Sequence, residues 1–436
     1  MIHRPCIRAP AMARRRLCRL PQCRLLARMV AVLAVIASGQ LWPAVPLRAE
    51  EQTRQGILLA ERRAKALRLE PEHLSAWEAR IRWIEETRLP EKVFVRGWHG
   101  LRPIIGGAPQ GAGTLAGGIG YTRGLDSEHL RVSASARTST NRYHMLDAGL
   151  VFPTELSGWP LRVELGAGFH DLRRFSFFGV GNDSADRRTF YQLKEATAGG
   201  RLDYRAAPSL MLGATGRWLS ARTDDHSKSP TVGSVFTGDQ APPGFEAPRT
   251  EFAVYGGHAL LDLRDDGFPA VGPELRLEAT RYEDVDNRFD FTVLEAELVT
   301  YVPLVYRNRI IAARLATSHA MPDRGQQVPF YLMRPIGGSR TLRGFDSDRF
   351  RDRRSLVVNL EYRWEVWTYA DFVLLYDSGK VFSDADDLDL SGLHNGYGFG
   401  VRAHAPAGGV LRFDITHSRE GFYLYLWLGD ALFFNE

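Results

Sequence analysis

Residues 409–418 of the chain read GVLRFDITHS, and apolar and polar side chains alternate along this stretch. Residues 274–281, ELRLEATR, repeat the pattern. Successive side chains of a β-strand point to opposite faces, so each stretch would present one apolar and one polar face. Apolar residues facing lipid and charged residues facing a water-filled lumen are typical of a transmembrane β-barrel. The apolar positions are Leu411, Phe413, Ile415, Leu275, Leu277 and Ala279, and the polar ones are Arg412, Asp414, Thr416, Arg276, Glu278 and Thr280.

A soluble β-sandwich is the alternative fold, because it too consists of short alternating strands. Its inward faces must be apolar, whereas here one whole face of each strand carries polar or charged residues. Aromatic residues also gather near strand ends, as in residues 362–372, YRWEVWTYADF, and 422–427, FYLYLW. Such clusters are typical of the interfacial girdles of a barrel. The pattern therefore favours the barrel.

Fifteen such segments lie between about Ala112 and Phe434, and their connections are alternately long and short, as expected for extracellular loops and periplasmic turns. Because a barrel of this type needs an even number of strands, we predict a sixteenth strand within residues 97–107, GWHGLRPIIGG. The predicted fold class is all-β: a 16-stranded antiparallel transmembrane β-barrel over residues 99–436, with a short helical segment before it. In residues 291–299 the alternation slips between Val293 and Leu294, which predicts a β-bulge.

The first 49 residues have the features of a secretory signal peptide. An arginine-rich start precedes an apolar run at residues 29–39, which is shorter than the ~18–20 residues that a membrane helix needs. Leu47 and Ala49 suit the −3 and −1 positions of a cleavage site. Met12 is a second possible start, and an uncleaved signal-anchor is the competing interpretation.

Removal of residues 1–49 changes the charge and the cysteine content. These residues hold nine arginines and no Asp, Glu or Lys, so the net charge falls from +5 to +5 − 9 = −4. The basic balance of the whole chain therefore gives no support for nucleic-acid binding. Cys6, Cys18 and Cys23 are the only cysteines, which excludes disulfides, thiolate metal sites and a cysteine nucleophile from the mature chain.

Residues 50–98 are predicted to form a periplasmic helical segment. Leu74, Trp77, Ile81 and Ile84 recur at helical spacing, and Pro90 ends the run. This amphipathic helix would either plug or cap the periplasmic mouth of the barrel, or dock a partner or the membrane surface.

The mature chain carries no G-x-S-x-G elbow, H-E-x-x-H helix or P-loop, and its histidines are scattered singly. We therefore predict no enzyme activity, no cofactor and no metal site. Carboxylates such as Glu278 and Asp414 are interpreted as solvated barrel residues. A hydrolase whose Ser, His and Asp come from distant strands stays open as a remote alternative.

Residues 334–382 resemble the C-terminal half of the BamA/TamA superfamily of outer-membrane proteins, the bacterial surface antigen barrels. The segment holds the tetrad Leu342-Arg343-Gly344-Phe345, with GGS before it, NLEYRW on the next strand and YDSG on the strand after that. Five strands follow the motif, as in the family, and residues 177–183, FFGVGND, resemble a loop of some members. The resemblance covers most of residues 100–430 and implies a sixteen-stranded barrel in the outer membrane of a Gram-negative bacterium.

The resemblance also implies a lock between a loop and the lumen. In the family a long loop folds back into the barrel, and its arginine meets carboxylates of the inner wall. The matching residues here are Arg343, Gly344, Phe345, Glu361 and Asp377. Strand alternation independently places Glu361 on the inward face. Because the lumen is expected to be wet, each contact should contribute about 1–3 kcal/mol.

Family members usually carry periplasmic POTRA domains, for which residues 50–98 are too few and too helical. The expected function is therefore that of a POTRA-less protein, expected to be a monomer, that helps to insert or translocate proteins or other macromolecules at the outer membrane. Its expected partners are outer-membrane lipids and either unfolded outer-membrane client proteins or a periplasmic partner at residues 50–98. A passive channel or structural pore is the alternative. Glycines at 113, 117, 118, 120 and 124 would either weaken pairing of the first and last strands or relieve crowding in the barrel.

Overall fold

The computed structural model describes residues 83, 87, 97–105, 116–125, 129–153, 160–226, 230–245, 247, 249–265, 270–304, 308–367, 370–404 and 410–429. The predicted signal peptide lies outside these residues, and so does most of the predicted helix at 50–98. Within that helix Trp83 and Thr87 are helical, and the Thr87 hydroxyl donates to the Trp83 carbonyl at 2.6 Å.

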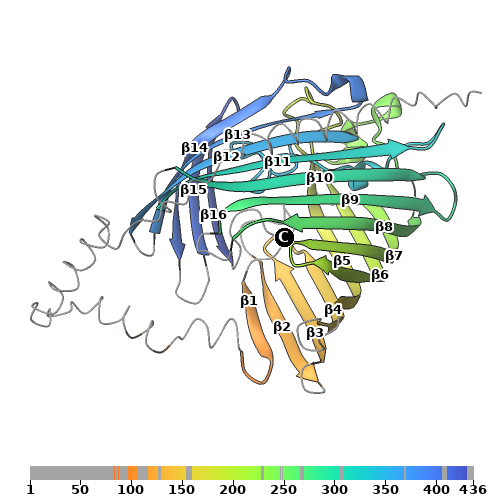
Figure 1. Cartoon of the computed structure of the whole chain (residues 1–436). Coiled ribbons are helices and arrows are strands. Elements are labelled where there is room, and N and C mark those ends of the chain that lie inside the picture. Colours follow the sequence, from red (N-terminus) through yellow and green to blue (C-terminus); the bar gives the residue numbers. More distant parts are fainter. Residues whose placement is uncertain are drawn as a thin grey trace, which may run out of the picture. The chain divides into compact units, whose positions relative to one another are not determined.

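Sixteen antiparallel strands form one sheet, in which every strand pairs with its neighbours in sequence (Figure 1). This confirms the predicted 16-stranded antiparallel fold, including the strand expected within residues 97–107. The strands are β1 (Leu101–Ile105), β2 (Ala116–Leu125), β3 (Leu130–Ser139), β4 (His144–Phe152), β5 (Leu161–Phe177), β6 (Thr189–Ala207), β7 (Leu210–Asp225), β8 (Thr250–Asp262), β9 (Gly272–Asp284), β10 (Phe291–Pro303), β11 (Arg309–Pro322), β12 (Arg354–Trp367), β13 (Ala370–Phe382), β14 (His394–His404), β15 (Val410–Ser418) and β16 (Gly421–Gly429).

The alternation in sequence becomes an alternation in burial. In β12 the side chains of Asn359 and Glu361 are buried, while those of Leu360 and Trp364 are exposed. Polar residues therefore turn to the inward face and apolar residues to the outward face, as a lipid-facing strand requires. No helix among the described residues is long and apolar enough to cross a membrane.

The connections are long on one side of the sheet, which we call the long-loop side. Its connections are residues 140–143, 178–188, 226–249, 285–290, 323–353, 383–393 and 419–420, together with the partly described link between β1 and β2. They hold the short helices α5 (Val232–Val235), η2 (Gly238–Gln240), η3 (Phe330–Leu332) and η4 (Ala385–Asp387).

The bulge predicted between Val293 and Leu294 is wrong. Strand β10 pairs without a register shift along both neighbours. The slip in the hydrophobic pattern at Leu294 therefore reflects which residue types occupy a regular strand. It does not reflect an extra, bulged residue in β10. Shifts occur instead between Leu172 and Phe175, Arg205 and Ala207, and Glu365 and Trp367.

An apolar core fills the inward face on the long-loop side. Its centre is Phe330 of the 323–353 connection, whose ring lies 4.9 Å from that of Tyr191 and 5.0 Å from that of Phe177. A second cluster joins Val328 and Met333 to β7, β8, β10 and β11. The 323–353 connection, which we call the inner loop, is therefore packed against the inward face as part of the core.

Candidate functional site

Arg343 lies on the inner loop, and its side chain is completely buried. Its Nε donates to Asp377 Oδ2 at 2.6 Å, and its Nη2 donates to Asp377 Oδ1 at 2.7 Å. Its Nη1 donates to Glu361 Oε1 at 2.6 Å. The backbone N–H of Arg343 adds a bond to Asp377 Oδ2 at 3.0 Å. The structure thus brings Arg343, Glu361 and Asp377 together, with the two-pronged geometry that a planar guanidinium allows.

Gly344 and Phe345 complete the contact of the motif with the wall. Gly344 has a φ of +93°, and an added Cβ would lie 3.0 Å from the Cβ of Ser418 and 3.2 Å from the His417 carbonyl oxygen. A larger residue would be both strained and crowded there. The Phe345 ring packs edge-on against Phe350 at 5.3 Å, inside a small apolar cluster.

Four further charged residues surround this pair of carboxylates. Asp414 of β15 lies 3.5 Å from Nη1 of Arg343, and it accepts from Arg402 and Arg412. Glu361 accepts also from Arg363 at 2.9 Å and from Arg402 at 3.3 Å. We call the seven residues the charge network: Arg343, Glu361, Arg363, Asp377, Arg402, Arg412 and Asp414.

The network is buried, which corrects two expectations. Asp414 was predicted to be a solvated barrel residue, but it is fully buried, whereas Glu278 is exposed as expected. The surroundings of Arg343 are likewise not wet, because the inner loop covers them. Removing one member of a buried ion pair costs about 3–5 kcal/mol, since its partner is left as an uncompensated charge. That is more than the 1–3 kcal/mol expected for a wet lumen.

Arg343 stays protonated in this setting. Burial alone would lower the pKa of Arg343, but the carboxylates of Asp377, Glu361 and Asp414 raise it above its ordinary value.

Besides Arg363, Arg402, Arg412 and Asp414 of the charge network, three more residues of this site were not predicted from the sequence. The Tyr425 hydroxyl of β16 accepts from Gly344 N at 3.2 Å and donates to the Phe345 carbonyl at 2.9 Å. The Ser418 hydroxyl donates to the Gly344 carbonyl. At Gly396 of β14, an added Cβ would lie 1.9 Å from the Arg343 carbonyl oxygen. These residues carry the contact of the inner loop as far as the last strand.

The inner loop is also tied to other loops of the long-loop side. Arg349 donates to Glu420 at 2.9 Å and to the Ser184 hydroxyl at 3.0 Å, and it lies over the Phe178 ring. Gly181 N donates to the Arg351 carbonyl at 2.8 Å.

The FFGVGND stretch reaches the far strands of the sheet. The Asn182 amide donates to the Gly392 carbonyl at 2.8 Å, and its side-chain oxygen accepts from Val381 N at 3.0 Å. The 178–188 connection therefore bonds to β13 and to the 383–393 connection, across the inner loop.

The inner loop also holds a buried carboxylate, that of Asp348. Asp348 has a φ of +60° and is 4% exposed, and its Oδ2 has no hydrogen-bond partner among the described residues. Burial raises the pKa of Asp348 to about 6, and Arg351 opposes this shift. Tyr143 and Tyr191 are the other ionisable groups that interact with it electrostatically.

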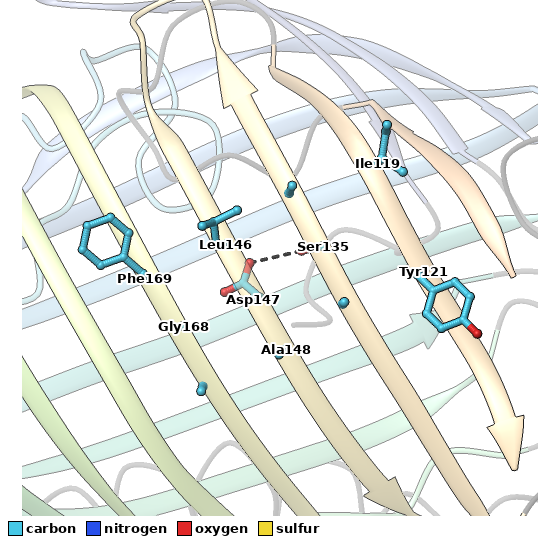
Figure 2. Close-up of a pocket in the computed structure, with 11 residues that line it drawn as sticks. Ile119, Tyr121, Ser135, Leu146, Asp147, Ala148, Gly168 and Phe169 are labelled. Atoms are coloured by element: carbon cyan, nitrogen blue, oxygen red, sulfur yellow. Dashed lines mark hydrogen bonds between the residues drawn. The ribbon is translucent and has the colours of Figure 1, made fainter.

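A cavity of about 610 Å³ lies over β2–β5, away from the charge network (Figure 2). Register puts Ala134 opposite Ala148 and Ala148 opposite Ala167, so alanines line this stretch of the sheet. Leu146 and Phe169, both exposed, stand beside them. The outward face here is apolar.

The polar residues at this cavity do not have the order of a hydrolytic triad. Figure 2 shows the bond from the Ser135 hydroxyl to Asp147 Oδ2, at 3.2 Å. Asp147 also accepts from Arg137 at 2.7 Å and bonds to His170 at 2.8 Å. The carboxylate thus sits between serine and histidine, whereas activation of a serine requires the histidine to contact it. No group of three or more His, Cys, Asp or Glu in the described part of the chain could hold a metal ion.

Comparison with known proteins was made for sequence and for structure. A model of the Omp85 superfamily domain matches residues 130–420. BamA from Haemophilus ducreyi, in a form lacking POTRA domains 1–3, superposes with a TM-score of 0.55 at 13% identity, covering 76% of this chain and 69% of that one. CdiB from Escherichia coli superposes with a TM-score of 0.51 at 13% identity, covering 76% of this chain and 62% of that one. No curated protein sequence matches the chain.

Proposed function

The chain belongs to the Omp85 superfamily and is a β-barrel protein of the Gram-negative outer membrane, and from this premise we propose that it helps to insert or translocate macromolecules at that membrane. The proposal retains a barrel without catalysis, whose residues 50–98 would serve as a periplasmic segment. Its clients would be unfolded outer-membrane proteins.

The observation that carries the proposal is the packing of the inner loop. Phe330, Phe345 and Arg343 are all fully buried between the loop and the inward faces of the strands. The 178–188 connection adds hydrogen bonds to the inner loop and to the 383–393 connection. A chain filled in this way offers little room for free passage through the lumen on the long-loop side. A cargo would leave at the edges of the sheet, where β1 and β16 have no neighbour in the described chain.

A passive pore is the second candidate, and the same packing argues against it. An open channel requires a water-filled path, whereas the core clusters of the long-loop side are apolar. The order of Ser135, Asp147 and His170 gives a hydrolase no support either.

Depletion of the protein, followed by quantitative comparison of the outer-membrane proteome, tests the proposal. We expect a defined set of barrel proteins or surface macromolecules to fall, and re-expression to restore them. An unchanged outer membrane on depletion, together with a large, stable conductance of the purified protein in planar bilayers, would favour the pore and reject the proposal.

Within this function, we propose that Arg343, Gly344, Phe345, Glu361 and Asp377 lock the inner loop to the wall. The lock would hold the lumen closed while the edge strands exchange partners. Arg343→Ala tests this role, since it should impair function in a barrel that still resists unfolding by detergent at room temperature.

A further inference from the structure

Strands β5, β6 and β7 extend beyond their neighbours on the long-loop side. They span 17, 19 and 16 residues, whereas β4 spans 9 residues. Pairing of β4 with β5 ends at Asp171, and pairing of β8 with β7 ends at Ala221. A tilted transmembrane strand needs about 9–11 residues to cross the hydrocarbon core. The level of Asp171 and Ala221 therefore marks the membrane boundary on this part of the sheet.

The outward face of β5–β7 changes from apolar to ionic at this boundary. Phe169 and Trp218 point outward on the membrane side of it and are 46% and 39% exposed. The next outward residue of β5 is Asp171, which stands opposite Lys194 of β6. On its other side Lys194 stands opposite Arg222 of β7. A row of ionisable side chains thus adjoins an apolar surface, so one lipid molecule can contact both.

Lys194 has no direct counter-ion in the part of the chain that the structure describes. Its side chain makes no hydrogen bond or ion pair with another described residue. Asp171, which stands opposite it, accepts instead from Arg173 at 3.1 Å and from Gln192 at 2.5 Å. The half-buried ammonium group of Lys194 therefore keeps its donors available for a partner outside the chain.

The surroundings of Lys194 carry more positive than negative charge. Side chains directly opposite each other in an antiparallel pair have Cβ atoms about 4.5–5.5 Å apart, and like charges at such positions destabilise the sheet. Lys194 and Arg222 form such a pair. Five described cations share this outward surface with three described carboxylates: Arg173, Arg174, Lys194, Arg222 and Arg249, against Asp171, Asp224 and Glu251. An anion that contacts both Lys194 and Arg222 would offset their repulsion.

We propose that Lys194 and Arg222 bind the phosphate of an anionic lipid in the membrane leaflet on the long-loop side. The phosphate would accept from the Lys194 ammonium and the Arg222 guanidinium, both of which are favourable phosphate ligands. The acyl chains of the lipid would lie against the apolar surface below, beside Phe169 and Trp218. The inference goes beyond the proposed function, and neither depends on the other.

Trp218 provides a fluorescent probe beside the proposed site. The full chain is reconstituted in vesicles of dioleoylphosphatidylcholine, and part of the lipid is replaced by a lipid with brominated acyl chains, which quenches tryptophan fluorescence on contact. The brominated lipid carries either a phosphatidic acid or a phosphatidylcholine headgroup. The signal of the matching Trp218→Phe protein is subtracted in each case, so that only the fluorescence of Trp218 is compared.

We expect phosphatidic acid to quench Trp218 at an about 5-fold lower mole fraction than phosphatidylcholine, because each nearby cation adds to the attraction of an anionic headgroup. Lys194→Gln should reduce this preference to about 2-fold or less, and Lys194→Arg should retain it. Arg281→Gln is the matched control, since it also removes one positive charge from the outward face. Arg281 is already held by Asp323 through two bonds at 2.8 and 2.7 Å, so the preference should not change.

Equal quenching by the two lipids in the unchanged protein would overturn the inference, and so would an undiminished preference in Lys194→Gln. An equal loss of preference in Lys194→Gln and Arg281→Gln would also overturn it, because general surface charge would then explain the result. Heat-modifiable migration on gels shows that each variant is folded. The depletion experiment does not involve Lys194, so a failure here leaves the proposed function standing.

Discussion

Strands β12–β16 and strands β1–β3 are held in the sheet by different forces. The first group shares the charge network and the inner loop, with ion pairs linking β12, β13, β14 and β15. The second group pairs through its backbone and carries small residues, with Gly118 so close to β3 that an added Cβ would lie 2.1 Å from the Ala136 carbonyl oxygen. At this glycine the crowding interpretation fits. Strands β12–β16 are thus fixed by buried side chains, and strands β1–β3 mainly by backbone hydrogen bonds.

Arg343→Ala should have the largest effect on the difference between the two ends of the sheet, because it removes the centre of the charge network. Glu361 and Asp377 would lose their shared cation, which should cost about 3–5 kcal/mol and release the inner loop. Limited proteolysis of folded protein in detergent measures the release, with cleavage expected within residues 323–353. Arg340→Ala, at an exposed arginine of the same loop, is the control and should leave cleavage unchanged. Equal cleavage of the two variants would show that Arg343 does not hold the loop.

Asp348→Asn should change how the stability of the inner loop depends on pH. The folded-state pKa of about 6 lies above the ordinary value of 3.8, so the folded protein binds this proton more tightly than the unfolded chain. The contribution of Asp348 to the free energy of unfolding is therefore fully present below pH 4. It is lost as the pH rises through 6, and the loss is at most about 3 kcal/mol. Asparagine tolerates the positive φ and cannot ionise.

To test Asp348→Asn, the unfolding midpoint of the inner loop is measured by proteolysis at several pH values between 4 and 8, for the variant and for the unchanged protein. The variant should be the more stable protein at pH 8 and should gain nothing at pH 4. The same pH slope in both proteins would assign the titration to another group.

Gly396→Ala should displace the Arg343 carbonyl, because the new Cβ would lie 1.9 Å from its oxygen. Overpacking of this kind costs about 1–3 kcal/mol. The matched control is Gly166→Ala on β5, where the nearest atom would be 3.7 Å away. Thermal loss of heat-modifiable migration compares the two, and only the first should unfold at a lower temperature. A lower temperature for both would mean that alanine in any strand of this sheet has the same effect.

Tyr425→Phe should have the smallest effect, since it removes one hydroxyl and keeps the ring. Each lost hydrogen bond contributes about 0.5–1.5 kcal/mol. Amide hydrogen exchange at Gly344 should accelerate, because its N–H donates to that hydroxyl. Tyr423→Phe is the control on the same strand. Unchanged amide exchange at Gly344 would show that the Tyr425 hydroxyl does not hold the inner loop to β16.

The fold followed from local patterns, and the site followed only in part. Alternation within one strand is visible in sequence, and it placed Glu361 inward and revealed the sixteen strands. The contributions of Gly396 and Ser418 depend instead on register, since Gly396 stands opposite both Asp377 and Ser418. Side-chain periodicity does not define register between strands, so the sequence offered no signal for these residues.

The charge network shows that Arg343 and Asp377 do not form an isolated pair. Exchanging the charges of Arg343 and Asp377 would suit an isolated pair. In the network, a carboxylate at residue 343 would meet Glu361 and Asp414. The charges that converge there come from four strands and the inner loop, which no single segment of sequence contains.

The last hairpin of the sheet supplies contacts that the inner loop can make only after the whole chain has been synthesised. Asp414 lies 71 residues after Arg343 in sequence, and Tyr425 lies 81 residues after Gly344, so both are made after the segment that they secure. A chain shortened before Asp414 would retain Glu361 and Asp377 but would lack the hydroxyl and carboxylate partners of β15 and β16. Its inner loop would therefore make fewer contacts with the wall and would be more open to proteases.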